Sequence, residues 1–195
     1  MKNIKSILTT GLLSLFLLTA IQAQDKAYQE GEKVLNVGMS LGYYGYGYFG
    51  NRSGFTVPLN AAFEYGITDQ ISVGPYAGYA RWSYKYDVGG AETKYSWTFV
   101  AVGARGSFHY TELFNELTDG DLNEEKIDLY VSLLLGLEFR SYNDDSDLNY
   151  YGNDTVVRLG PNLGVRYLLS QNLGVYLEGG RGTFGWLNFG VTARF

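Results

Sequence analysis

The stretch LNFGVTARF, which runs from Leu187 to Phe195 and ends the sequence, alternates apolar and polar side chains without a break. Successive side chains of a β-strand point to opposite faces, so such a strand has one apolar face and one polar face. The apolar face consists of Leu187, Phe189, Val191, Ala193 and Phe195. The polar face carries Asn188, Gly190, Thr192 and Arg194. The pattern predicts a strand that separates an apolar medium from a polar one.

The other end of the chain has the three regions of a secretory signal peptide. Lys2 and Lys5 form a basic region, an apolar run covers residues 7–21, and Ala23 supplies a small residue at the expected cleavage point. The run is too short, and too often interrupted by threonine and serine, for a membrane-spanning helix of about 20 apolar residues. We therefore expect a signal peptide over residues 1–23 and a single barrel domain over residues 24–195.

Composition narrows the class of protein. The 26 glycines, 18 tyrosines and 11 phenylalanines favour strands and turns over helices. A formal net charge of −5 argues against nucleic acid as a partner. The sequence has no cysteine, which excludes disulfide bonds and a lipid-modified cysteine anchor. Packing and hydrogen bonding must therefore hold the fold together.

Seven further segments alternate in the same way as the C-terminal one. The clearest is Ile127–Ser141, in which four leucines, a valine and a phenylalanine share one parity. Single-chain bacterial barrels use even strand numbers, so eight segments predict an all-β fold, a closed eight-stranded antiparallel up-and-down transmembrane β-barrel. The predicted strands are Val34–Tyr44, Phe55–Tyr65, Ile71–Trp82, Tyr95–Tyr110, Ile127–Ser141, Thr155–Tyr167, Leu173–Gly179 and Trp186–Phe195.

Periodicity alone does not say which face lies inside, because a soluble barrel turns its apolar parity inward and a membrane barrel turns it outward. The polar parity has arginines and carboxylates but no lysine, whereas a water-exposed sheet face normally carries lysine. A narrow lumen of paired charges explains this better, since an unpaired buried charge costs several kcal/mol. The predicted lumen network consists of Glu64, Arg105, His109, Asp128, Glu138, Arg140, Arg158, Arg166, Glu178 and Arg194.

Three internal segments, Val37–Tyr43, Ile71–Tyr79 and Gly103–Tyr110, and the terminal Phe195 resemble those of small Gram-negative outer-membrane β-barrels of the OmpX and OmpA transmembrane-domain type. The resemblance implies a location in the cell outer membrane, in contact with outer-membrane lipid and lipopolysaccharide. It also implies that the apolar face of Leu187–Phe195 is a signal for the barrel assembly machinery. Activity stays open, because barrels of this size have unrelated functions.

Two features depart from simple alternation. Pro58, Pro75 and Pro161 fall inside predicted strands, where each removes a ladder hydrogen bond, so we expect bulges or local distortions there. Trp97 and Phe99 share the parity of the lumen network although they are large and apolar. A bulge near Phe99 would reconcile them with the pattern.

With a periplasmic N-terminus, the barrel presents four loops outside the cell, at Gly45–Gly54, Ser83–Lys94, Tyr142–Asp154 and Gly180–Gly185. Tyrosine beside glycine makes adaptable contact surfaces, so an unidentified extracellular partner is expected at the first and third loops. The candidate contact residues are Tyr46, Tyr48, Phe49, Tyr150 and Tyr151. On the periplasmic side, Thr111–Lys126 is long and acidic, which favours a solvated loop over a short helix.

Three classes of function remain. A structural and surface-interaction scaffold with a plugged lumen is preferred, and a narrow pore for ions or small solutes is the alternative. The third is a lipid-modifying enzyme, since Ser107 lies two residues from His109, and Asp128 or Glu138 could orient the imidazole. These side chains point away from lipid by parity, so we expect no enzymatic activity. We also expect no cofactor, because the G-x-G-x-x-G string at Gly180–Gly185 links two strands and opens no helix. We expect no metal, because the run that imitates a calcium loop from Asp119 has Glu124 where that loop needs glycine and Tyr130 at its twelfth position.

Overall fold

The computed structural model describes residues 26–42, 52–88, 91–144 and 153–195. The predicted signal peptide and parts of the predicted first and third surface loops lie outside the described residues. The same holds for the candidate contact residues, which are Tyr46, Tyr48, Phe49, Tyr150 and Tyr151.

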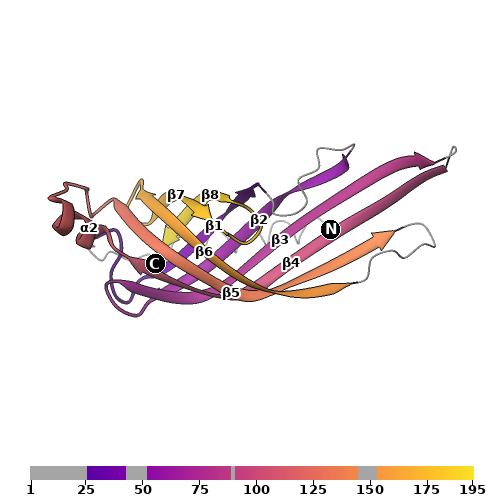
Figure 1. The fold of residues 1–195 in the computed structure, drawn as a ribbon. Coiled ribbons are helices and arrows are strands. Elements are labelled where there is room, and N and C mark those ends of the chain that lie inside the picture. Colours follow the sequence, from indigo (N-terminus) through magenta and orange to yellow (C-terminus); the bar gives the residue numbers. More distant parts are fainter. Residues whose placement is uncertain (1–25, 43–51, 89–90, 145–152) are drawn as a thin grey trace, which may run out of the picture.

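Eight antiparallel strands pair in chain order and close into a barrel, because β1 pairs with β8 as well as with β2 (Figure 1). The predicted fold class is confirmed. The strands are β1 (Lys33–Leu41), β2 (Arg52–Gly66), β3 (Ile71–Val88), β4 (Ala91–His109), β5 (Ile127–Asp144), β6 (Asp154–Leu168), β7 (Leu173–Gly180) and β8 (Leu187–Arg194).

The acidic segment between β4 and β5 begins with a helix, α2 (Thr111–Thr118), at one end of the barrel (Figure 1). A solvated loop was the favoured prediction there, and it is wrong for these residues. Asn115 explains the order of the segment, because its side chain binds the backbone of Leu122 and the carboxylate of Glu124. Within the described ranges, no helix is both long and apolar enough to cross a bilayer.

The apolar parity of the strands faces outward. On β5, Leu133, Leu135 and Phe139 are 49%, 56% and 45% exposed, while Ser132 and Glu138 on the other parity are buried. Burying a leucine or phenylalanine is worth about 1.5–3 kcal/mol, so a barrel in water would hide these side chains. An exposed apolar belt around a polar interior is the arrangement of a barrel surrounded by lipid.

The wall of the barrel is much taller on one side than on the other. β3 and β4 have 18 and 19 residues, whereas β1, β7 and β8 have 9, 8 and 8. β2, β5 and β6 also belong to the tall side, with 15, 18 and 15 residues. We call the end of the barrel that carries α2 the lower end, and the end to which the tall strands extend the upper end.

The tall strands replace two of the predicted surface loops. The predicted loop Ser83–Lys94 is wrong, because β3 and β4 stay in register up to the pair Val88 and Ala91. Tyr84, Tyr86 and Thr93 in this segment are residue types that favour strands. The predicted loop Tyr142–Asp154 is shortened in the same way, since β5 reaches Asp144 and β6 already begins at Asp154. β1, by contrast, ends at Leu41 and not at Tyr44 as predicted.

The proline prediction holds at only one of three positions. The register of β2 against β3 shifts between Thr56 and Leu59, where Pro58 lies. Pro75 and Pro161 pair in continuous register with β4 and β5, so they cause no register shift there. A proline lacks only its own N–H, and the ladder can continue where that group is not needed.

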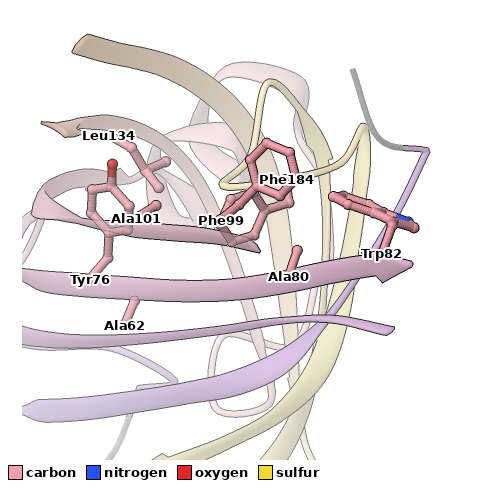
Figure 2. Packing of buried hydrophobic residues seen from close by; sticks show 8 residues of the cluster. All are labelled: Ala62, Tyr76, Ala80, Trp82, Phe99, Ala101, Leu134 and Phe184. Atoms are coloured by element: carbon pink, nitrogen blue, oxygen red, sulfur yellow. The ribbon is translucent and has the colours of Figure 1, made fainter. Parts of the chain in front are cut away.

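The predicted bulge near Phe99 is wrong. β4 keeps one register with both β3 and β5 through this region, so Trp97 and Phe99 point into the lumen. The upper lumen is lined with apolar side chains, and Phe99 is fully buried in this cluster (Figure 2). The cluster consists of Ala62, Tyr76, Ala80, Trp82, Phe99, Ala101, Leu134 and Phe184.

The segment after β7 folds into the barrel. Gly180–Gly185 was predicted as an exposed hairpin loop, but Thr183 and Phe184 are 7% and 1% exposed. Gly78 on β3 makes room for them, because a Cβ atom at Gly78 would lie 2.4 Å from Cγ2 of Thr183 and 2.6 Å from Cε2 of Phe184. The loop thus fills the space that a side chain at position 78 would need. We call residues 181–186 the inner loop.

Candidate functional site

Glu64, on β2, is the centre of a buried ion network in the lower half of the lumen. Its Oε1 atom lies 3.2 Å from Nε of Arg105 and 2.8 Å from Nη2 of Arg166. Its Oε2 atom accepts hydrogen bonds from the hydroxyl groups of Ser72, at 2.8 Å, and Ser107. None of these five side chains is more than 4% exposed. One carboxylate thus pairs with two guanidinium groups, and an interior without bulk water requires such pairing.

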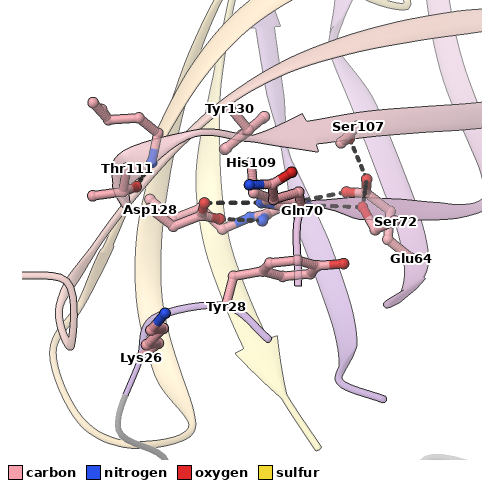
Figure 3. A network of polar contacts seen from close by, with 12 residues as sticks. Lys26, Tyr28, Glu64, Gln70, Ser72, Ser107, His109, Thr111, Asp128 and Tyr130 are labelled. Atoms are coloured by element: carbon pink, nitrogen blue, oxygen red, sulfur yellow. Dashed lines mark hydrogen bonds and ion pairs between the residues drawn. The ribbon is translucent and has the colours of Figure 1, made fainter. Parts of the chain in front are cut away.

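Asp128 and His109 extend this network toward the lower end. Asp128 lies 2.6 Å from Nη1 of Arg166 through Oδ2 and 2.8 Å from Nδ1 of His109 through Oδ1. On its other side, Nε2 of His109 lies 3.0 Å from Oγ of Ser72 (Figure 3). Because Ser72 also donates to Glu64, the contacts form a closed ring through Arg166.

Tyr130 and Glu178 complete the network on the other side of the two arginines. The carboxylate of Glu178 lies 2.6 Å from Nη2 of Arg105 and accepts a hydrogen bond of 2.8 Å from the Tyr130 hydroxyl. The guanidinium carbon of Arg166 lies 4.2 Å from the centre of the Tyr130 ring, close enough for a cation–π interaction. We call this set the lower network: Glu64, Ser72, Arg105, Ser107, His109, Asp128, Tyr130, Arg166 and Glu178.

A second set of charges, the upper network, consists of Glu138, Arg140 and Arg158. Glu138 is fully buried and binds both arginines, with Oε1 2.7 Å from Nε of Arg140 and Oε2 2.6 Å from Nη2 of Arg158. Both arginine side chains are 24% exposed. The upper network therefore has one more cation than carboxylate among its own members.

The N-terminal segment (residues 26–32) closes the lower end of the barrel. The Tyr28 ring stacks on the His109 ring, with 3.4 Å between ring centroids and 8° between planes. Figure 3 shows Tyr28 lying beside His109 within the barrel mouth. The backbone of Gly31 and Glu32 bonds to Gly66 at the end of β2, which anchors the segment. Tyr28 is 6% exposed, so it acts as a plug for the lower network.

Two ion pairs fasten the N-terminal segment to the barrel. Arg194 of β8 pairs with the buried Glu32 and donates to the backbone oxygen of Lys26. Lys26 binds Glu112 of α2 at 2.7 Å, and this hydrogen bond raises the pKa of Lys26 above its usual value. Burial raises the pKa of Tyr28, so its hydroxyl stays protonated and donates to the backbone oxygen of Thr68.

All ten predicted lumen residues point into the barrel interior, but they form three groups instead of one. Six belong to the lower network, three form the upper network, and Arg194 pairs separately with Glu32. Sequence reasoning missed Tyr28, Glu32, Ser72 and Tyr130. Ser72 and Tyr130 have lumen parity, which could have identified them. Tyr28 and Glu32 precede the first strand, and parity carries no information about them.

The serine predicted to accompany His109 is the wrong one. Ser107 lies on the same strand and does not contact the imidazole, whereas Ser72 on β3 does. The Ser107 hydroxyl donates instead to Glu64 on β2. Ser72, His109 and Asp128 thus have the connectivity of a hydrolase triad. Ser72 is fully buried, however, and its hydroxyl is shared with the carboxylate of Glu64.

We expect Tyr28→Ala to expose His109 to modification. The stacked phenol covers one face of the imidazole, so its removal opens the lower mouth to water. Carbethoxylation of the folded protein by diethyl pyrocarbonate, followed by mass spectrometry, should proceed several-fold faster than in the wild type. The measurement is unambiguous because His109 is the only histidine in the sequence.

The matched control for this experiment is Tyr65→Ala. Tyr65 lies on β2 and is 47% exposed on the outer face of the barrel, so its removal should leave the reactivity of His109 unchanged. Rapid modification of His109 in the wild-type protein would show that Tyr28 does not close the lower end.

Structures with the same fold exist among known proteins, although no protein-family model and no curated protein sequence matches this chain. The N-terminal β-barrel domain of Pseudomonas aeruginosa OprF superimposes with a TM-score of 0.50 at 16% identity, over 86% of this chain and 98% of that domain. Two others are the Yersinia pestis attachment invasion locus protein Ail (TM-score 0.49, 16% identity, 85% and 99% covered) and the P. aeruginosa outer membrane protein OprG (0.46, 12%, 86% and 97%). The OprF likeness establishes the fold, that of a small β-barrel of the outer-membrane type.

Proposed function

We propose that this protein is an integral barrel of the Gram-negative outer membrane that acts as a non-conducting scaffold and displays loops at the cell surface. The observation that carries the proposal is the closure of the lumen at two levels. Tyr28 covers the lower network, and Phe184 of the inner loop is buried among the apolar residues of the upper lumen. The paired charges between them fill the cross-section of a barrel that has room only for side chains.

The membrane assignment is supported by the outer surface. The exposed apolar belt needs an apolar surrounding, and the predicted signal peptide would bring the chain across the inner membrane. Outer-membrane lipid and lipopolysaccharide are therefore the proposed surroundings. The protein is proposed to be non-enzymatic, because the one Ser–His–Asp arrangement in the described residues is buried and engaged with Glu64.

The last strand is proposed to address the chain to the barrel assembly machinery. β8 pairs with β1 from Leu187 to Arg194 and so closes the barrel. Of the residues of the predicted signal, Leu187, Val191 and Phe195 are exposed on the outer face. Phe189 is half-buried, and the small Ala193 is covered by its neighbours. A mostly apolar, lipid-facing edge is thus available to a partner before the barrel closes.

A single experiment tests both parts of the proposal. Protein taken from the outer-membrane fraction, with the faster gel migration of an unheated folded barrel, is reconstituted into planar lipid bilayers. We expect no sustained conductance above that of protein-free bilayers, because both ends of the lumen are filled. Recovery in a soluble fraction without heat-dependent migration would overturn the membrane assignment, whereas stable open-channel currents would overturn the plug and favour a narrow pore.

A further inference from the structure

The barrel wall has a notch beside the upper half of β6. β7 ends at Gly180, which pairs with Asn162, so the part of β6 above Asn162 pairs with β5 only. Figure 1 shows β6 extending well beyond the short strands β7 and β8. Just above this pair, the Arg181 backbone donates a hydrogen bond to the backbone oxygen of Pro161. Among the described residues, this upper part of β6 therefore has no strand partner on its β7 side.

A cavity of about 380 Å³ lies at this open edge. It reaches both faces of β6, since Arg158 on the inner face and Val157 and Leu159 on the outer face all line it. Arg181 of the inner loop and Arg140 of β5 contribute to the same lining. Gly160 allows this approach, because a Cβ atom there would lie 2.0 Å from the backbone oxygen of Arg181.

Arginine side chains line the inner side of the cavity. Three arginines line it, and none of the described residues that line it carries a carboxylate. Glu138 lies beneath and is shared between Arg140 and Arg158, and Asp154 is 3.9 Å from Arg140. Guanidinium groups match the geometry of phosphate oxygens and bind them through paired hydrogen bonds. An anionic group with several oxygens fits this set.

The outer side of the cavity belongs to the lipid-facing belt. Val157 and Leu159 are 69% and 59% exposed, and they pair with Leu137 and Leu135 of β5, which face lipid as well. A ligand that enters from the side therefore meets apolar side chains first and arginines next. An apolar entrance followed by arginines suits a molecule with an acyl chain and an anionic head group.

The geometry points to a lateral binding site for the phosphate group of a lipid, held by Arg140, Arg158 and Arg181, with its acyl chain along Val157 and Leu159. This inference rests on the proposed membrane location. It gives Arg140 and Arg158 a ligand at the side of the barrel in addition to their pairing with Glu138.

Native mass spectrometry of the folded protein in a nonionic detergent tests the site with three probes. They are phosphatidic acid, phosphatidylcholine with the same acyl chains, and inorganic phosphate. We expect retention of phosphatidic acid in preference to phosphatidylcholine. The double variant R158Q/R181Q should bind phosphatidic acid at least about tenfold more weakly, a loss typical of a charge-assisted hydrogen bond.

Two further variants separate the site from general effects of charge and folding. R81Q removes an exposed arginine of β3 outside the cavity, and it should bind as the wild type does. V157E keeps all three arginines, changes an exposed outer residue, and should weaken binding by placing a carboxylate beside the phosphate. Gel migration of the unheated protein confirms that each variant is folded.

Four results would overturn the site while leaving the barrel proposal intact. They are equal binding of the two lipids, equal loss in R81Q and R158Q/R181Q, unchanged binding in V157E, and displacement of phosphatidic acid by equimolar inorganic phosphate. The last would identify a site for free phosphate. A chain that does not migrate as a folded barrel or does not reach the outer membrane would instead overturn the proposed function on which the site rests.

Discussion

Glu64→Gln is expected to lower the free energy of unfolding by about 3–5 kcal/mol, the cost of breaking a buried ion pair by removing one partner. The amide keeps the shape of the side chain but leaves Arg105 and Arg166 without the charge that lies between them. Glu178 and Asp128 continue to pair with one arginine each, so the expected loss of stability comes from the Glu64 carboxylate alone. Urea titration of the protein folded in phosphatidylcholine vesicles, followed by tryptophan fluorescence, measures the change.

Glu116→Gln is the matched control. Glu116 is an exposed residue of α2, and substitutions at such positions usually change the free energy of unfolding by no more than about 0.5 kcal/mol. A loss of less than about 1 kcal/mol in Glu64→Gln, the range of exposed pairs, would show that the lower network is solvated and not buried.

Gly164→Val is expected to destabilise the barrel by about 3 kcal/mol, at the upper end of the cost of overpacking. A Cβ atom at Gly164 would lie 2.3 Å from two ring atoms of Tyr130. That ring cannot easily give way, because it is fully buried, hydrogen-bonded to Glu178 and stacked on Arg166. The same urea titration in vesicles reports the loss.

Gly179→Val, on the neighbouring strand β7, is the matched control, and we expect no loss of stability from it. A Cβ atom at Gly179 would have no atom within 4 Å, and the residue faces outward. Valine favours strands over glycine, so this variant should be as stable as the wild type or more stable. Equal destabilisation by the two valines would mean that strand pairing and not the lumen packing is affected.

The lumen is packed like a protein core, although it contains charges. Such a core keeps the strands in one register and leaves the loops free to vary in sequence, as the proposed display scaffold requires. Each arginine of the lower network is tied to carboxylates from more than one strand.

The order of strands and the direction of their faces could be predicted because both are local properties. Alternation along Ile127–Ser141 assigns each side chain to a face without knowledge of any neighbour. Even the polarity of the lumen could be inferred, since arginine without lysine on one parity indicates a confined face. The partners of Asp128 and Glu64 could not be predicted in this way. Glu64 and Arg166 are 102 residues apart, and only closure of the barrel brings them together.

The predictions that were wrong share one cause, which is that they depend on contacts between distant strands. Phe99 was expected to turn outward through a bulge, because the sequence does not tell that the upper lumen is apolar. Phe184 was expected on a surface loop, because the space beside Gly78 exists only in the folded barrel. Ser107 was paired with His109 by nearness in sequence, whereas the strand pairing places Ser72 there. Each error concerns which group fills a volume enclosed by several strands.

The sequence by itself determined that this chain forms an eight-stranded barrel with an apolar outer face and a charged lumen, because side-chain direction along a strand repeats every two residues. Only the tertiary structure decided how the lumen is divided and closed. The lower network, the Tyr28 plug, the inner loop and the lateral notch all depend on strand register and on unequal strand heights. Those quantities arise when the sheet closes on itself, since closure places residues from distant strands within one narrow space.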